Sequence, residues 1–316
     1  MSVLVLAGPT ASGKSHWALQ LAQHFNAEII SMDSALVYQG MDIGTAKPTP
    51  QEQVQVPHHG LDMVPPSQSY SAARFAADAQ LAYDAIRARG KRVLVVGGTM
   101  LYHRAWLQGL HPLPAADPAW RQAMAERAQA VGWPALHAEL ARVDPATATR
   151  LAPHDSQRIQ RALEVWHVSG KPLSQWHASP PPASQAPRAT LVSLEPSAKP
   201  WLLQRIEARL HTMLEQGVAR EMARLMETPG LHAQLPAMRC VGYRQAWQLL
   251  AEHGPWRPKV QAQWLALTAV ATRQLAKRQL TWLRSMPTRH VVHADAPDVA
   301  EQLLALATTH WRTCHA

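Results

Sequence analysis

Short apolar runs alternate with longer amphipathic stretches through the first third of the chain. The runs have the length of buried strands and lie at residues 3–7, 27–31 and 92–96. Between and after them, the spacing of apolar residues predicts helices over Lys14 to about Phe25, over about Ala72–Arg89 and from Thr99 onward. This alternation predicts a parallel sheet flanked by helices, an α/β fold, in which ligands bind beyond the carboxyl ends of the strands.

The pattern changes at two proline-rich segments, residues 111–118 and 179–187. The stretch between them is rich in Ala and Arg and predicts helices without a strand. Beyond it, the pattern predicts a returning strand over Ala189–Leu194 and long helices over Trp201–Met226 and Lys259–Arg284. We therefore expect a catalytic core formed by residues 1–116 and 188–316, interrupted by an all-helical insert over residues 117–187.

The first predicted strand runs into a glycine-rich turn, GPTASGKS, over Gly8–Ser15. The turn fits G-x-x-x-x-G-K-[ST], in which backbone N–H groups wrap a phosphate, Lys14 adds a positive charge and the Ser15 hydroxyl can bind Mg²⁺. ATP hydrolases usually pair this loop with an acid that ends a later strand and holds the metal. Here the strand over residues 92–96 continues into residues 97–99, which contain no acid. We therefore expect the loop to hold phosphates for a reaction other than ATP hydrolysis.

Two polar residues follow the ends of later strands, at the same edge of the predicted sheet as this loop. An isolated Asp after a strand is most often a turn or cap residue, but the position of Asp33 beside a phosphate loop suggests that it accepts a proton. Thr99 can cap the next helix, hydrogen-bond a reacting group, or do both.

The chain has 316 residues, 47% of them hydrophobic and 17% charged, which indicates a folded protein with a substantial core. No apolar run reaches the length of a membrane span. The cysteines, Cys240 and Cys314, offer neither a disulfide framework nor a metal-binding pair, and we expect a cytoplasmic monomer. The net charge is +9, and from Trp201 onward 14 basic residues stand against 8 acidic ones, which suggests a polyanionic partner.

The predicted helix over Lys259–Arg284 has a cationic face. At about 100° per residue, three cations of this helix fall within about 40° of one another, and the expected packing residues lie opposite them. The cations are Arg273, Lys277 and Arg284, and the packing residues are Trp264, Ala271, Leu275 and Trp282. A solvated face is the ordinary interpretation. Because the helix contains no acidic residue, we favour contact with a phosphate backbone.

A second basic segment, RCVGYR, places two Arg and a Tyr around a Gly over Arg239–Arg244. An aromatic ring beside Arg in a loop is suited to stacking on, and hydrogen bonding to, an unpaired base. A helix cap is the alternative, and the spacing of these residues does not decide between the two.

Six segments resemble the bacterial tRNA dimethylallyltransferases, also called tRNA isopentenyltransferases. They run in family order from Gly8 to Arg284 and read GPTASGKS, DSALVYQGMDIGTAK, GGTMLY, DSQRIQRALEV, RCVGYRQ and TRQLAKRQLTWLR. The resemblance implies a P-loop core like that of nucleotide kinases and a helical insert that grips the anticodon stem. It also implies transfer of a dimethylallyl group from dimethylallyl diphosphate to N6 of adenosine 37 in tRNA.

The resemblance also implies roles for residues. The loop would hold a diphosphate leaving group through Gly8, Pro9, Thr10, Ala11, Ser12, Gly13, Lys14 and Ser15, with Mg²⁺ on Ser15. Asp33 would be the general base and Thr99 would orient the amine or the diphosphate. Arg209 would supply a second cation, with Arg205 as the alternative. The segments that would contact tRNA contain Asp33, Ser34, Ala35, Leu36, Thr99, Arg121, Gln157, Arg158, Ile159, Gln160, Arg161, Arg239, Cys240, Val241, Gly242, Tyr243, Arg244, Arg273, Lys277, Arg278 and Arg284.

Two other classes of function share some of these features. A small-molecule or nucleotide kinase would also pair a phosphate loop with an Asp after the second strand, but it has no use for a large basic second half. An RNA-binding protein regulated by nucleotide would explain the charge but would leave Asp33 without a role.

Overall fold

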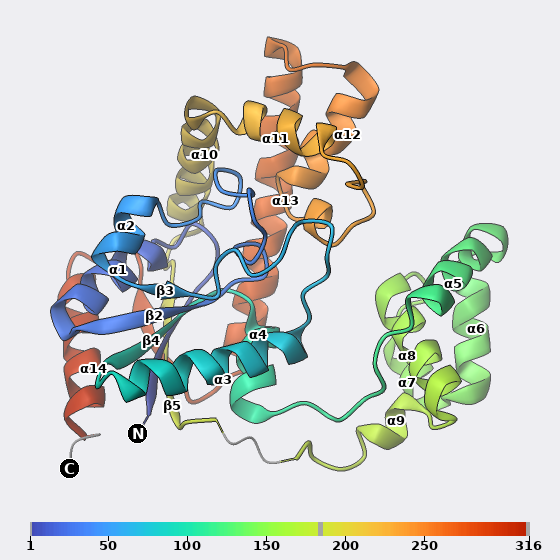
Figure 1. Cartoon of the computed structure of the whole chain (residues 1–316), viewed down its shortest axis with the longest axis horizontal. Coiled ribbons are helices and arrows are strands. Elements are labelled where there is room, and N and C mark those ends of the chain that lie inside the picture. The colour runs from blue at the N-terminus through green and yellow to red at the C-terminus, as the bar shows by residue number, and fades with distance from the viewer. Residues whose placement is uncertain (1, 183–185, 314–316) are drawn as a thin grey trace. The chain divides into compact units, whose positions relative to one another are not determined.

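The computed structural model describes residues 2–182 and 186–313 of the chain (Figure 1). Its contacts divide the chain into two compact units, one of Met1–Leu107 with Gln185–Ala316 and one of Gln108–Ser184. The second unit is all helical over its described residues, and its first and last helices begin at Pro118 and end at Trp176. Part of the proline-rich linker expected over residues 179–187 lies outside the described residues, at 183–185.

The first unit is built on a sheet of six parallel strands in the order β3-β2-β4-β1-β5-β6. The strands are β1 (Val3–Ala7), β2 (Ala27–Met32), β3 (His58–His59), β4 (Arg92–Gly97), β5 (Ala189–Glu195) and β6 (His290–His293). The predicted α/β class is therefore confirmed, and the strand after the insert pairs with β1 as expected. The edge strands β3 and β6 were not predicted, because two and four residues are too short to show a periodic pattern.

Helices surround this sheet. They are α1 (Lys14–Phe25), α2 (Pro50–Gln55), α3 (Ala72–Ala88), α4 (Met100–His103), α10 (Lys199–Gln216), α11 (Val218–Glu227), α12 (Tyr243–His253), α13 (Pro258–Arg284) and α14 (Val299–Thr313). The single helix predicted over Trp201–Met226 is wrong. Gly217, at φ 97°, adopts the left-handed conformation that ends α10, and α11 starts directly after it.

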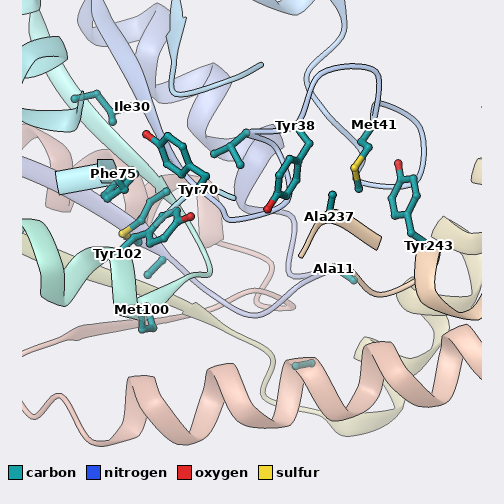
Figure 2. Close-up of a cluster of buried hydrophobic side chains, with 14 of the residues drawn as sticks. Ala11, Ile30, Tyr38, Met41, Tyr70, Phe75, Met100, Tyr102, Ala237 and Tyr243 are labelled. Atoms are coloured by element: carbon teal, nitrogen blue, oxygen red, sulfur yellow. The ribbon is translucent and has the colours of Figure 1, made fainter. Parts of the chain in front are cut away.

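Alternate residues of the central strands face opposite sides of the sheet. On β1, Leu4 and Leu6 pack with residues of α1 and α14, whereas Val5 belongs to a larger cluster with residues of α3, α10 and α13. Figure 2 shows part of the larger cluster, in which Tyr102 of α4 stacks on Phe75 of α3 with ring centroids 4.3 Å apart. Helices therefore cover both faces of the sheet, as its continuous apolar strands predict.

The second unit has its own core. Its helices are α5 (Pro118–Val131), α6 (Trp133–Val143), α7 (Pro145–Arg150), α8 (Ser156–Ser169) and α9 (Leu173–Trp176). The buried residues that hold them together are Met124, Ala128, Leu136, Leu140, Ala148, Ile159, Ala162 and Leu163. No helix within the described parts of either unit is long and apolar enough to span a membrane.

Candidate active site

The glycine-rich loop joins β1 to α1 and curls at the start of that helix. Ala11 and Gly13 have positive φ angles of 65° and 89°. Gly8 has no room for a side chain, because a Cβ there would lie 2.6 Å from a backbone oxygen of β5. Lys14 Nζ donates to the carbonyl oxygen of Pro9 at 3.0 Å, so the ammonium folds back over the loop. A curled backbone at a helix N-terminus directs N–H groups and positive partial charge toward an anion.

Two hydroxyls complete the polar groups of the loop. The Ser12 Oγ is buried and has no hydrogen-bond partner among the described residues, so a bound anion could accept from it. The Ser15 side chain is exposed in the first turn of α1. No group of three His, Cys, Asp or Glu that could hold a metal occurs within residues 2–182 and 186–313. A single exposed hydroxyl fits Mg²⁺ that takes its other ligands from phosphate oxygens and water.

Lys14 lies in an unusual electrostatic environment. Burial lowers the pKa of its ammonium to about 8; the negative charge of Asp33 opposes this shift and the positive charge of Arg209 adds to it. A desolvated ammonium interacts more strongly with an incoming phosphate than a solvated one does. The charge of Asp33 therefore acts on two cations, Lys14 and Arg209.

This environment predicts that anion binding depends on pH. Below about pH 8 the free protein carries the ammonium charge, and above it the charge is lost. In metal-free buffer containing EDTA, the Kd for inorganic diphosphate should therefore rise by up to about tenfold per pH unit above pH 8. Inorganic diphosphate loses its own last proton in this range, so the wild-type Kd is compared at each pH with that of a control that meets the same change in the ligand. Calorimetry measures the profile, and the Lys14→Arg variant, whose side chain stays charged, is the control. If the Kd of the Lys14→Arg variant rose equally steeply with pH, the titration of Lys14 would not be the cause of the rise.

Arg209 of α10 reaches into this group of charges. Its guanidinium donates to Thr10 Oγ1 at 3.4 Å and to the carbonyl oxygen of Thr45 at 3.0 Å. Burial lowers the pKa of Arg209, and the charge of Asp33 opposes that shift. Arg209 therefore links the phosphate loop to the segment that follows Asp33.

Arg205, one turn earlier on α10, contacts the same loop from outside. Its Nε donates to the carbonyl oxygen of Ala11 at 2.8 Å, and its guanidinium lies over the ring of Trp201, 4.9 Å from the centroid. The side chain is exposed, whereas that of Arg209 is partly buried. The geometry therefore favours Arg209 over Arg205 as the cation that acts inside the site.

Asp33 and Thr99 lie at the ends of two neighbouring strands, β2 and β4. Asp33 Oδ1 accepts from Ala35 N at 2.9 Å, and no described residue donates to its Oδ2. Thr99 Oγ1 accepts from Ser34 N at 3.0 Å and donates to Ser34 Oγ at 3.3 Å, while Thr99 N donates to Met32 O at 3.2 Å. Thr99 makes no side-chain cap bond to α4. Its hydroxyl therefore fixes the turn that presents Asp33, and one carboxylate oxygen stays free to accept a proton.

Gln279 of α13 is a site residue that the sequence did not single out. Its amide accepts from Thr10 N and donates to Gly98 O, so it touches the phosphate loop and the turn before Thr99. The backbone N–H of Thr10 is thereby engaged by a side chain. The only signal in the sequence is a polar residue on the face of α13 that carries the buried Ala276 and Leu283.

Glu221 of α11 is a second residue that the sequence did not reveal. Its buried carboxylate accepts backbone N–H bonds from Asp42, Ile43 and Gly44 at 2.8, 2.8 and 3.0 Å, and the Tyr243 hydroxyl donates to it at 2.6 Å. These bonds anchor the loop that begins at Asp33. A glutamate among the buried apolar positions of α11 is the signal that could have identified it.

Replacing Glu221 by alanine should destabilise the protein strongly. The change leaves three backbone N–H groups and one buried hydroxyl without their acceptor, so the free energy of unfolding should fall by about 3 kcal/mol or more. Urea unfolding measures the loss. Glu227→Ala, at an exposed position of the same helix, should change stability by less than about 0.5 kcal/mol. Equal losses in the two variants would contradict the anchoring role.

The cationic face predicted on α13 is present. Arg273, Lys277, Arg278 and Arg284 are all exposed, and no carboxylate among the described residues pairs with them. The packing role predicted for Trp282 is wrong, since that side chain is 38% exposed and Leu283 is buried instead. Buried positions recur about every four residues along α13, and four residues turn the helix about 40° past a full turn. The buried stripe therefore winds slowly around the helix and leaves Trp282 at its edge.

The segment over Arg239–Arg244 is folded as the cap of α12. Gly242 is the N-cap residue, and its N–H donates to the Gln245 side chain at 2.9 Å. Tyr243 is buried, so of the two alternatives for this segment the structure shows the helix cap. Burial and the Glu221 charge raise the pKa of its hydroxyl.

Of the other residues in this segment, Arg239 and Arg244 are exposed, whereas Cys240 and Val241 are partly buried. Burial and the charge of Asp33 raise the pKa of the Cys240 thiol to about 12, which places this segment close to the site. Cys314 lies outside the described residues.

In the helical unit, the predicted tRNA-binding residues lie on and around α8. Glu164, which is fully buried, accepts two hydrogen bonds from Arg121, both at 2.7 Å, and one from Arg161 at 2.5 Å. Gln157 and Arg158 are exposed. Gln160 is partly buried and donates to the Arg121 backbone. Ile159 is buried in the core of the unit, and the contact of this segment with tRNA stays a prediction.

The comparisons with known proteins agree with one another. A family model described as IPP transferase matches residues 36–286, and one described as isopentenyl transferase matches residues 1–60. The tRNA dimethylallyltransferase of Methylibium petroleiphilum is 56% identical over 310 residues, which cover 97% of this chain and 94% of that protein.

Solved structures give the same result. The tRNA isopentenylpyrophosphate transferase of Bacillus halodurans has a TM-score of 0.68 at 28% identity, covering 100% of this chain and 99% of that one. A eukaryotic dimethylallyltransferase acting on tRNA has a TM-score of 0.78 at 28% identity, covering 99% of this chain and 80% of that one. The chain therefore belongs to the tRNA dimethylallyltransferase family, as its motifs predicted.

Proposed function

We propose that this tRNA dimethylallyltransferase takes its prenyl group from dimethylallyl diphosphate and attaches it to N6 of adenosine 37, releasing diphosphate and leaving N6-isopentenyladenosine. The observation that carries the proposal is the convergence of a curled phosphate loop, two desolvated cations and one carboxylate. A prenyl donor whose leaving group is an anion needs the cations to bind that group. An acceptor amine that loses a proton needs the carboxylate to take it. The naming of the relatives supports the same reaction.

The donor end of the reaction falls to the phosphate loop. Its backbone N–H groups, the Ser12 hydroxyl, Lys14 and Arg209 would bind the diphosphate. As the allylic C–O bond breaks, its electron pair goes to the diphosphate oxygen, and the cations stabilise that growing charge more than they stabilise the bound substrate. Mg²⁺ held by Ser15 would neutralise further charge on the diphosphate when bound.

The acceptor end falls to Asp33. An adenine amine is a poor nucleophile, and its proton becomes acidic only as the new C–N bond forms. Asp33 would then take that proton on Oδ2, the oxygen that no described residue occupies. Thr99 would keep the Asp33 turn in place through Ser34. A bond to nitrogen forms, a bond to oxygen breaks, and the proton ends on the carboxylate.

The exposed cations are suited to tRNA. Arg273, Lys277 and Arg284 on α13, with Arg239 and Arg244 beside α12, would contact phosphates and lend sequence-independent affinity. Arg121, Gln157, Arg158, Gln160 and Arg161 of the helical unit would add contacts of their own. The target adenine has to leave the anticodon-loop stack before a carboxylate can reach its amine.

Nucleoside mass spectrometry of cellular tRNA tests this function. In a strain that lacks the gene, N6-isopentenyladenosine and its derivatives should disappear from tRNA. The wild-type gene should restore them, and the Asp33→Asn variant, expressed at the same level, should not. Unchanged isopentenyladenosine in the strain without the gene would contradict the proposal.

A further inference from the structure

Gln279 lies on the packed side of α13 and hydrogen-bonds two loops at once. Its Oε1 accepts from Thr10 N at 2.8 Å, and its Nε2 donates to Gly98 O at 3.1 Å. A backbone N–H only donates and a carbonyl only accepts, so these partners fix the orientation of the amide. One side chain thus joins the loop after β1 to the turn after β4.

The fold leaves space for this amide at Gly98. A Cβ at that position would overlap Gln279 Nε2 and would lie 3.1 Å from the carbonyl oxygen of Gly8. The turn after β4, the phosphate loop and the Gln279 side chain are therefore in contact at one point. A side chain at residue 98 would push the amide out of it.

The two groups that Gln279 binds belong to opposite ends of the proposed reaction. Thr10 lies in the phosphate loop, and its hydroxyl accepts from Arg209 at 3.4 Å. Gly98 precedes Thr99, whose hydroxyl holds the turn that presents Asp33. The separation between the leaving diphosphate and the proton acceptor therefore depends on this amide.

The same helix carries the cations that the proposed function assigns to tRNA. Around the axis of α13, Gln279 lies about 120° from Arg273 and about 160° from Lys277. Those two side chains are exposed, whereas Gln279 is partly buried. Gln279 can therefore be changed without altering the cationic face.

We propose that Gln279 is a positioning residue for prenyl transfer, which sets the phosphate loop and the Asp33–Thr99 edge at the spacing that the reaction needs. This inference rests on the proposed function. Gln279 acts through Thr10 and Gly98 and not on the reacting atoms. Because a misplacement of about 1 Å can slow a reaction by about 10²-fold, its loss should slow the chemical step more than it weakens the binding of either substrate.

The first test replaces the amide by an apolar side chain of similar size. Gln279→Leu should lower the single-turnover rate at saturating dimethylallyl diphosphate and tRNA by about tenfold or more. Its Kd for tRNA and for inorganic diphosphate should stay within about threefold of wild type. Gln274→Leu, at an exposed position of the same helix, is the matched control and should keep the wild-type rate. Circular dichroism and the melting temperature show whether each variant is folded.

A second variant separates positioning from simple packing. In Gln279→Glu, an ionised carboxylate can accept from Thr10 N but repels the Gly98 carbonyl, whereas a protonated carboxyl offers one acceptor and one donor, as the amide does. The rate of this variant divided by the wild-type rate should therefore rise as the pH falls from about 8 to about 5.5, toward the pKa of the new carboxyl. A ratio independent of pH would overturn the positioning role.

Two results for the Gln279→Leu variant would also count against the positioning role. A Gln279→Leu rate above about a third of wild type, or a parallel loss of tRNA affinity, would overturn the inference. Failure of the proposed function looks different, because the wild-type protein would then transfer no prenyl group to tRNA at all. The positioning role of Gln279 is tested only by the rates of its variants divided by the rate of an active wild-type protein.

Discussion

Replacing Asp33 by asparagine should lower kcat by about 10²–10⁴-fold. The amide oxygen can still accept from Ala35 N, so the turn should be preserved, but an amide cannot take a proton from the adenine amine. The loss should therefore appear in the chemical step. Because the Asp33 charge raises the pKa of Lys14, donor binding is compared well below pH 8, where Lys14 stays charged, and there removing the negative charge should not weaken it.

Single-turnover kinetics and a tRNA-binding assay measure the two effects separately. The tRNA Kd should stay within about threefold of wild type, because a general base acts on a group that is already bound. Asp84→Asn, at an exposed position of α3, is the control and should keep the wild-type rate. If Asp33→Asn retained more than about a tenth of wild-type turnover, Asp33 would not be the general base.

Reversing the charge of the α13 face should weaken tRNA binding by a large factor at low salt. Arg273, Lys277 and Arg284 are exposed, so changing all three to Glu leaves the buried stripe of the helix intact. Each lost phosphate contact should reduce the slope of log Kd against log salt by about 0.7–0.9, which makes about 2.1–2.7 for three contacts. Binding of dimethylallyl diphosphate should not change, because these side chains do not touch the phosphate loop.

A control with the same net charge separates local contact from long-range attraction. Lys199, Arg220 and Arg312 are exposed cations on other helices of the core, and changing them to Glu alters the net charge equally. We expect this variant to lose a smaller factor in affinity and to keep the wild-type slope. If the α13 variant also kept the wild-type slope, its cations would be a solvated face and not a tRNA contact.

Much of the fold follows from local pattern. Strand β1 is apolar over its whole length and β2, β4 and β5 each carry an apolar run, so their positions could be predicted within a residue or two. The break at Gly217 was missed because the apolar spacing continues on both sides of it. The edge strands were missed because pairing with a neighbour, and not local sequence, defines them.

The residues of the candidate site likewise fall into those that local sequence identifies and those that it does not. Groups carried by a motif, such as Lys14 and Asp33, could be identified because the motif places them at strand ends. Gln279 and Glu221 could not, because their role comes from which loops they meet in three dimensions. The role of Tyr243 stayed open between base stacking and a helix cap for a related reason, since the local sequence does not show that its ring is buried.

The most direct test of the central claim is a reaction of the purified protein with Mg²⁺, dimethylallyl diphosphate and an unmodified tRNA transcript. The product is digested with a base-specific ribonuclease, and mass spectrometry locates the added group. We expect one dimethylallyl group on N6 of adenosine 37 and one diphosphate released per group transferred. A tRNA that gains no prenyl group while the protein hydrolyses ATP or phosphorylates an acceptor would contradict the account, and so would transfer to another position.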